Sequence, residues 1–425
     1  MKRAGFRRDG ILSTFVNVPP SRHPRVSFRG RHAWTILTIL SCFLWGCSTK
    51  LPAKGVEAFD RCNYDQAIET FQEKVKEGGK DYVLYNLALL SAAMRAGKYD
   101  LAEKAALDAQ RVMWSDAGKE RGTASLVSAE AIKVFKGEPF EKAMAMIYPG
   151  ILYFNRGDYD NARAAFSKAV LAIKQKEKNR EDFALAYVLE AKVALKMGEL
   201  DNARIALEKA KARYANNSLF EVEKLKKNNT IFLVEMGKAP RKIRKGPGGS
   251  LDDWQRRDYP ERSASIFVDD VEIGKTTEVA DLTTQAKTQG RTGKDAVQVT
   301  KGVARDAAIA TTVIAADQAA RGNKTAGWVA LGAGLFAVAN QSQADVRQWE
   351  LLPDLLQVQF AQLSPGEHRV RVVFYNASGR ALPGEEQVWY TDTGSENPDR
   401  IFVFHSSPCQ RTGRLENTET KGGGS

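Results

Sequence analysis

The chain has 425 residues, a formal net charge of +12 and four cysteines, and its length allows more than one domain of ordinary size. A net positive charge of this size is typical of nucleic-acid-binding proteins. However, residues 1–46 alone carry eight basic residues against one acidic residue. Only +5 remains for the rest of the chain, so we expect no nucleic-acid partner.

A short apolar run, residues 33–46, follows a basic stretch and ends at Cys47. The run is shorter than the roughly 20 apolar residues that span a bilayer. Its length is that of the hydrophobic region of a secretory signal. The sequence Leu-Trp-Gly-Cys, which ends at Cys47, resembles the lipobox of bacterial lipoproteins.

The lipobox resemblance implies a signal peptide over residues 1–46, cleavage between Gly46 and Cys47, and a covalent lipid on Cys47 as the membrane anchor. Ser48 follows the anchor, which in that family implies the outer membrane, with the protein facing the periplasm. A plain signal peptide and an N-terminal anchor helix are the alternatives. Val26 is a second candidate for the true start of the chain.

Two cysteines, Cys62 and Cys409, remain outside this N-terminal segment. A disulfide between them is chemically feasible in an oxidising periplasm, although their wide separation in sequence gives it little support. No Cys or His cluster has the spacing of metal ligands. We therefore expect no metal and no cofactor apart from the lipid on Cys47.

One short pattern recurs in the first half of the chain: a turn residue shortly before an aromatic residue or leucine, and an alanine three positions after it. Its members are Tyr64 and Ala67; Gly97, Tyr99 and Ala102; Gly157, Tyr159 and Ala162; and Gly198, Leu200 and Ala203. The glycine ends one helix in a left-handed conformation, and the small alanine lets two helices approach closely. The pattern predicts paired helices.

This pattern resembles the tetratricopeptide repeat (TPR), whose second helix opens with such a signature. Tyr64 and Tyr99 are 35 residues apart, close to the repeat length of about 34, whereas Tyr159 and Leu200 are 41 apart. The resemblance implies an α-solenoid over residues 47–236. A solenoid presents a concave groove to partners, and we expect the signature aromatics to lie mainly in its core.

A Gly/Pro-rich basic segment, residues 237–262, is typical of a linker. Residues 263–407 then alternate strand patterns with turns, and residues 408–425 are typical of a flexible tail. Within this half, a Val-Asp-Asp turn and a Leu-Ser-Pro-Gly-Glu-His segment resemble the two parts of a PEGA-type β-sandwich. The predicted fold class is α+β: a TPR-like solenoid followed by a small β-sandwich-like domain.

An Ala/Gly-rich insertion at about residues 295–342 separates the two parts of the sandwich motif. Residues 296–320 and 326–340 each have a helical pattern. The first helix is expected to place one set of residues on a single face: Val303, Ala307, Ala310, Thr311 and Ile314. The insertion is either a buried helical hairpin or a surface that pairs with another subunit or dips into a membrane.

Asp345, Arg347 and Trp349 are a compact group of polar and aromatic residues. They form either a salt bridge beside a capping tryptophan or an interaction site. An Ala-Asp-x-Arg-x-Trp-x-x-Leu-Pro stretch resembles a segment of a family of uncharacterised bacterial repeat-containing lipoproteins. That resemblance also covers Gly137, Phe140, Glu141, Gly157, Asp158 and Tyr159, and it implies organisation rather than an activity.

The chain contains no nucleotide-binding, nucleophile-elbow or zinc-protease motif, so we expect no enzyme and no catalytic residues. The favoured function is a non-catalytic scaffold of the cell envelope, whose TPR groove binds a protein or peptide partner. The alternatives are a structural protein that self-associates or contacts the membrane through its helical insertion, and a regulator of cell-wall synthesis.

Overall fold

The computed structural model describes residues 50–115, 134–174, 183–211, 218–245, 251–288, 344–384, 386–393, 399–406 and 412–415. It also describes residues 308, 310–318, 321–322, 325–326 and 328–330 of the insertion. Residues 1–46 form a separate unit from residues 47–425. Cys47 and Gly46 lie outside the described residues, so the lipid attachment and cleavage sites stay predictions.

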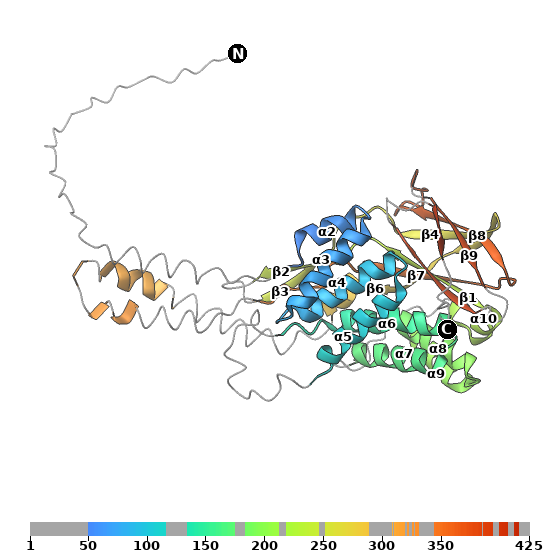
Figure 1. Ribbon diagram of the computed structural model, residues 1–425, viewed down its shortest axis with the longest axis horizontal. Helices are drawn as coiled ribbons and strands as arrows, with labels where there is room; N and C mark the ends of the chain where they lie inside the picture. Colours follow the sequence, from blue (N-terminus) through green and yellow to red (C-terminus); the bar gives the residue numbers. More distant parts are fainter. Residues whose placement is uncertain are drawn as a thin grey trace, which may run out of the picture. The chain divides into compact units, whose positions relative to one another are not determined.

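The first half consists of helices that pack as successive hairpins (Figure 1). The helices are α2 (Ala53–Asp60), α3 (Tyr64–Glu77), α4 (Tyr82–Arg95), α5 (Tyr99–Met113), α6 (Pro139–Asn155), α7 (Tyr159–Lys174), α8 (Ala184–Lys196) and α9 (Leu200–Lys211). The short helices η3 (Ser218–Phe220) and α10 (Val222–Lys227) lead into the strands. The predicted helix pairs are therefore confirmed.

The recurring signature occupies the turn and the start of the second helix in each hairpin. Tyr64, Tyr99, Tyr159 and Leu200 are the first residues of α3, α5, α7 and α9. Gly97 ends the α4 segment at φ 69°, and the next amide, of Lys98, donates to the Ala93 carbonyl at 2.9 Å. The signature alanines Ala67, Ala102, Ala162 and Ala203 are fully buried, as expected for close helix contacts.

The first helices of these hairpins, α4, α6 and α8, are buried on nearly every side. In α4 every residue from 83 to 93 is buried, and α6 and α8 are almost as completely covered. By contrast, α3, α5 and α9 bury one face and leave the other to solvent. A helix that is apolar all round must be covered on both sides, so a second layer lies against α4, α6 and α8.

That second layer is a four-stranded sheet with the strand order β10-β1-β7-β6. Its strands are β1 (Thr230–Met236), β6 (Thr277–Asp281), β7 (Leu355–Ala361) and β10 (Arg400–His405). Strand β1 runs parallel to β10 and antiparallel to β7. Every residue of β1 is buried, as expected for a central strand covered on both faces.

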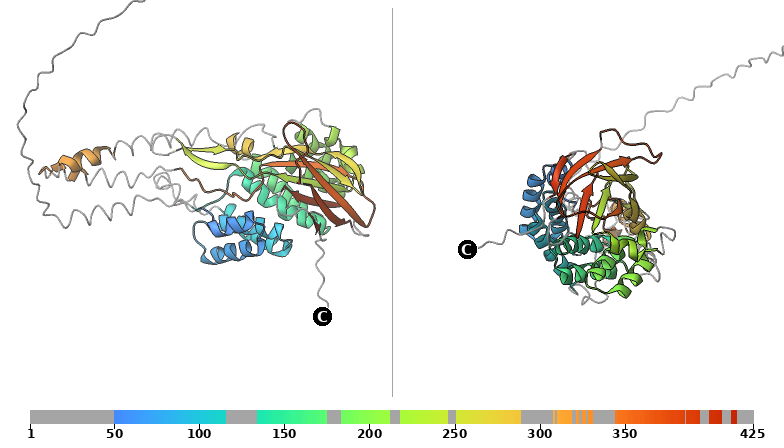
Figure 2. Two further views of the ribbon diagram at one scale, coloured as in Figure 1. Left: turned by 90° about the horizontal axis from the view of Figure 1, so that it is seen from above. Right: turned by 90° about the vertical axis from the view of Figure 1, so that its right-hand side faces the viewer.

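A five-stranded sheet with the order β11-β9-β8-β4-β5 forms the third layer. Its strands are β4 (Ser263–Val268), β5 (Val271–Lys275), β8 (Glu367–Tyr375), β9 (Gln387–Asp392) and β11 (Thr412–Leu415). Burial alternates along β8, which indicates one packed face and one solvated face. In the right-hand view of Figure 2 the helices curve around the strands of the sheets, with the blue helices beside the strands and the green helices below them.

Alternate residues of β1 connect the layers. Ile231 and Leu233 belong to the core shared with the helices, whereas Phe232, Val234 and Met236 belong to the core between the two sheets. Because successive side chains of a strand point to opposite faces, one strand packs against both neighbouring layers. The structure is therefore of mixed α and β type, and residues 230–236 are the middle of a sheet rather than the end of the helical domain.

The described part of the segment expected to be a linker, residues 237–245 and 251–262, includes two paired strands. It contains β2 (Arg241–Lys245) paired antiparallel with β3 (Leu251–Gln255). Trp254 of this hairpin is buried and contacts Phe140 edge to face, with ring centroids 5.5 Å apart. Three basic residues of this segment, Lys238, Lys242 and Lys245, have acidic partners, such as Asp60, 2.8 Å from Lys238.

The two parts of the sandwich motif meet in the five-stranded sheet, although about 90 residues separate them in sequence. Strands β4 and β8 pair antiparallel, and the β4–β5 turn is made by Asp269 and Asp270 at φ 48° and 67°. Asp269 Oδ2 lies 2.7 Å from His368 Nδ1, and Asp269 Oδ1 accepts from the Arg369 amide at 2.9 Å. Aspartate tolerates this left-handed turn, where the motif usually has glycine.

The helical insertion differs from the expected arrangement. Residues 310–318 are helical, but Ala310, Thr311 and Ile314 of the predicted face are exposed, while Ala308 and Ala315 are buried. Val303, Ala307 and residues 331–340 lie outside the described residues. Among the helices that the structure describes, none is long and apolar enough to span a membrane. The helix α11 (Leu282–Thr288) precedes the insertion.

The first prediction concerns the close approach of α6 and α7. A Cβ atom at Gly150 would lie 2.5 Å from the ring of Phe166, which is fully buried and cannot move aside. We expect Gly150→Ala to lower the free energy of unfolding by about 1–3 kcal/mol through overpacking, despite alanine's higher helix propensity. Chemical denaturation checks this, and a Phe166→Leu change should partly rescue the variant. A more stable Gly150→Ala protein would contradict this packing.

The second prediction uses the pH dependence of His368. Burial opposes its protonation, but hydrogen bonds with Asp269 and with the Ser364 carbonyl raise the pKa of His368 above its usual value. A raised folded-state pKa contributes stability below the unfolded pKa of about 6.5, and this stability is lost as pH rises through the folded value. The destabilisation caused by His368→Gln should therefore be larger at about pH 5.5 than at about pH 9. Equal losses at both pH values would exclude a charged His368.

Candidate functional site

The predicted group of Asp345, Arg347 and Trp349 lies in an irregular segment, residues 344–354, which we call the strap. Arg347 is almost fully buried, and its guanidinium contacts two carboxylates: Asp81 at 2.8 Å and Asp345 at 2.6 Å. Asp81 precedes α4 and is 266 residues away in sequence. The arginine therefore ties the strap to the helical layer.

Trp349 of the strap is 0% exposed and makes polar contacts with two different helices. Its indole N–H donates to Ser91 of α4 at 2.9 Å, and its backbone N–H donates to Glu141 of α6 at 2.5 Å. Its ring meets Tyr148 edge to face, with centroids 6.1 Å apart. These contacts place the three residues together, as the sequence predicts, but they face the protein's own helices.

Glu141 is held between the strap and the start of its own helix. It accepts hydrogen bonds from the amides of Trp349 and Glu138, and burial raises the pKa of Glu141 to about 7. Nearby, the ammonium of Lys242 from the β2–β3 hairpin pairs with Glu138 at 2.6 Å and Asp252 at 2.9 Å. The strap, the hairpin and the middle sheet therefore cover the inner surface of the helices, where a solenoid groove would bind a partner.

A buried polar cluster lies where the helices meet strands β1 and β10. Glu235 of β1 accepts a hydrogen bond from the Tyr148 hydroxyl at 2.9 Å, and its other oxygen lies 2.7 Å from His405 Nδ1. Burial, followed by the neighbouring charge of Arg95, lowers the pKa of His405 to about 4. His405 is therefore neutral near pH 7, and Glu235 is the charged member of the pair.

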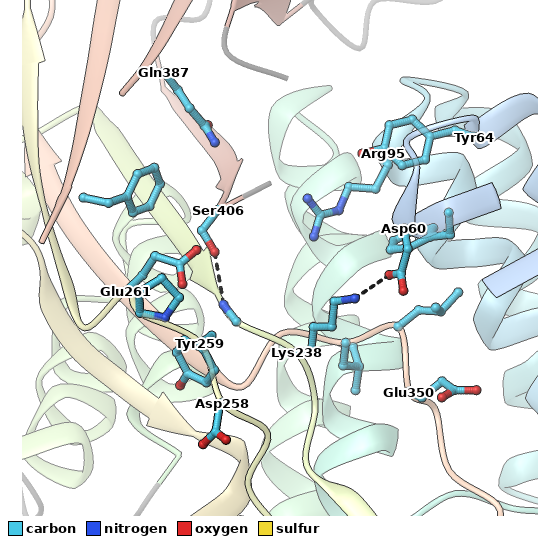
Figure 3. Close-up of a pocket in the computed structure, with 16 residues that line it drawn as sticks. Asp60, Tyr64, Arg95, Lys238, Asp258, Tyr259, Glu261, Glu350, Gln387 and Ser406 are labelled. Carbon is cyan, nitrogen blue, oxygen red and sulfur yellow. Dashed lines mark hydrogen bonds and ion pairs between the residues drawn. The ribbon is translucent and has the colours of Figure 1, made fainter. Parts of the chain in front are cut away.

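Beside this cluster, a cavity of about 290 Å³ opens between α2–α4 and the loops of both sheets. Figure 3 shows Arg95, Glu261, Gln387 and Ser406 around its interior. Phe59, Leu351, Leu352 and Phe374 add apolar surface. Two residues of the lining are fixed by ion pairs with close partners: Lys238 with Asp60 at 2.8 Å, and Glu350 with Arg257 at 3.5 Å.

Three charged residues of the lining form no ion pair with another described residue: Asp258, which is exposed, and Arg95 and Glu261. Arg95, the last residue of α4, lies over the ring of Phe59 at 5.8 Å and makes no ion pair there. Glu261 is 8% exposed, and its carboxylate oxygen Oε2 is buried with no hydrogen-bond partner. Burial lowers the pKa of Arg95, although an arginine remains charged at any physiological pH.

The sequence patterns do not predict a site at four residues of the cavity and the neighbouring cluster: Arg95, Glu261, Glu235 and His405. These residues are far apart in the chain and belong to no motif, and each has an ordinary local context such as a basic residue in the last turn of a helix. Only the tertiary fold brings them together. Of the recurring signature residues, Tyr64 lines this cavity, whereas the four signature alanines lie in the helical core.

Cys62, the cysteine that follows α2, is disulfide-bonded. The other three cysteines lie outside the described residues, so the pairing with Cys409 stays a prediction. Among the described residues, no group of three or more His, Cys, Asp or Glu side chains is arranged to hold a metal ion.

Comparison of the chain with protein-family models and with curated proteins finds no match.

The third prediction concerns the strap. Trp349→Ala removes a fully buried ring and two inter-layer contacts, so we expect a loss of about 3–5 kcal/mol in the free energy of unfolding. Trp328 is 75% exposed, and Trp328→Ala is the matched control, with an expected change within about 0.5 kcal/mol. Denaturant titration of both variants measures the difference, and equal stabilities would show that the strap does not hold the layers together.

Proposed function

We propose that this protein is a lipid-anchored, non-catalytic binding protein of the bacterial cell envelope, which contacts a partner protein through its helical insertion. In this proposal α2–α9 are a TPR-type array, and Cys47 carries the lipid that holds the protein at the outer membrane. The array and the sheets serve as the base from which the insertion is presented.

The observation that carries the proposal is the exposure of large apolar side chains in the insertion. Val313, Ile314, Trp328 and Val329 are all exposed, at 47% or more. Scattered surface hydrophobics are ordinary, but an Ala-rich segment that exposes a tryptophan and three aliphatic side chains is typical of an interaction surface. Small residues in the same segment also favour close helix–helix contact.

Binding in the inner groove of the array receives less support. A partner there would have to displace Trp349 and the ion pairs of Arg347, both of which are buried. Breaking a buried ion pair leaves an uncompensated charge and costs about 3–5 kcal/mol. The insertion is open to a partner without that cost, and it is therefore the better supported surface.

Self-association through the insertion is the second candidate, because the same exposed side chains can meet those of a second copy. A crosslinked complex that contains a different envelope protein supports the first candidate. A complex made of this chain alone supports self-association.

The fourth prediction tests the insertion in the natively anchored protein. We expect Val313→Ser with Ile314→Ser, and separately Trp328→Ser, to reduce the crosslinked complex about tenfold, because buried interface hydrophobics carry much of the binding energy. Val271→Ser in β5 is the matched control, since Val271 and Val313 are each 65% exposed. Unchanged crosslinking in both insertion variants would refute the proposal.

A further inference from the structure

The cavity beside α4 holds two opposite charges, Arg95 and Glu261, that form no close ion pair with another described residue. Elsewhere in the described chain, buried charged groups have partners: Arg347 has Asp81 and Asp345, Lys192 has Asp399 at 2.9 Å, and Glu235 has Tyr148 and His405. Native proteins pair nearly all their buried charges, because taking an unpaired charge out of water is costly. Glu261 departs from this rule, and Arg95, half-buried in the same cavity, has no close ion pair and only the longer-range attraction of Glu235.

The two side chains come from different walls of the cavity. Figure 3 shows Arg95 reaching in from the helical side and Glu261 from the loop before β4 on the side of the sheets. They form no ion pair with each other, so space remains between the guanidinium and the carboxylate. A ligand with one negative and one positive group would satisfy both.

We propose that this cavity binds a small zwitterion, whose oxyanion pairs with Arg95 and whose primary ammonium pairs with Glu261. A guanidinium presents parallel N–H donors that match a carboxylate or phosphate, and a carboxylate accepts from an ammonium. The proposal concerns a site separate from the helical insertion and does not depend on the function assigned to that insertion.

The remaining lining limits the size and the shape of the ligand. A volume of about 290 Å³ lies at the lower end of ligand pockets and suits a molecule such as an amino acid or a dipeptide. Ser406 and Gln387 add polar atoms to the lining and also hydrogen-bond with the Gly237 amide and the His405 carbonyl. Phe59 and Leu352 offer apolar surface for an uncharged side chain. The ethanolamine phosphate of a lipid headgroup carries the same pair of charges.

The test is calorimetric titration of the full-length protein with glycine, alanine, glutamate, Ala-Ala and phosphoethanolamine. We expect at least one to bind, and its N-acetylated or amidated analogue, which lacks one charge, to bind about tenfold more weakly or less. Binding of the amino acids or the dipeptide would identify the ligand as a free metabolite. Binding of phosphoethanolamine alone would identify it as a lipid headgroup. Absence of binding by every probe up to about 10 mM would overturn the proposal.

Variants separate recognition from folding. Arg95→Gln and Glu261→Gln should each weaken binding about tenfold or more, whereas Lys238→Gln, at a lining residue already paired with Asp60, should leave it unchanged. Without ligand, Glu261→Gln should unfold at the same temperature as the wild type or higher, because it removes a buried carboxylate oxygen that has no hydrogen-bond partner. Arg95→Gln also removes a positive charge that favours the buried Glu235 carboxylate, so it is compared for binding alone. A lower unfolding temperature for Glu261→Gln would mean that its carboxylate stabilises the fold and would overturn the proposal.

Discussion

The packing of the strap, residues 344–354, against the helices is the contact on which the other features depend. Trp349 and Arg347 each bridge to the helical layer from a segment more than 200 residues later in the chain. The helices α4, α6 and α8 are apolar on nearly all sides, so they need this second layer to exclude water. The helical and the strand-rich halves therefore share a core and cannot be treated as independent domains.

Sequence patterns predicted those features that depend on neighbouring residues. The Gly97, Tyr99 and Ala102 signature located a turn and a helix start, because left-handed caps and helix contacts are encoded within a few positions. The β4–β5 and β8 strands were also visible, since alternation and turn residues are local signals. The linker interpretation failed because composition does not show that Trp254 and Lys242 find partners on α6.

The candidate cavity was not predictable for the same reason. In the sequence, most of the helices lie between Arg95 and Glu261. Only the packing of the sheets against α2–α4 places the two residues around one cavity. The described structure thus contains charges of two kinds. The buried ion pairs of the strap hold the layers together, whereas Arg95 and Glu261 of the cavity form no close ion pair and are the groups that we propose bind a ligand.

Hydrogen exchange of the full-length protein, followed by mass spectrometry of its peptides, tests the central claim most directly. If the strap is an integral part of the shared core, peptides covering residues 344–354 exchange as slowly as those of α4 and α6, in one cooperative unit. Fast exchange of the strap beside protected helices would contradict the account. It would show that the inner surface of the helices opens readily and is free to receive another protein.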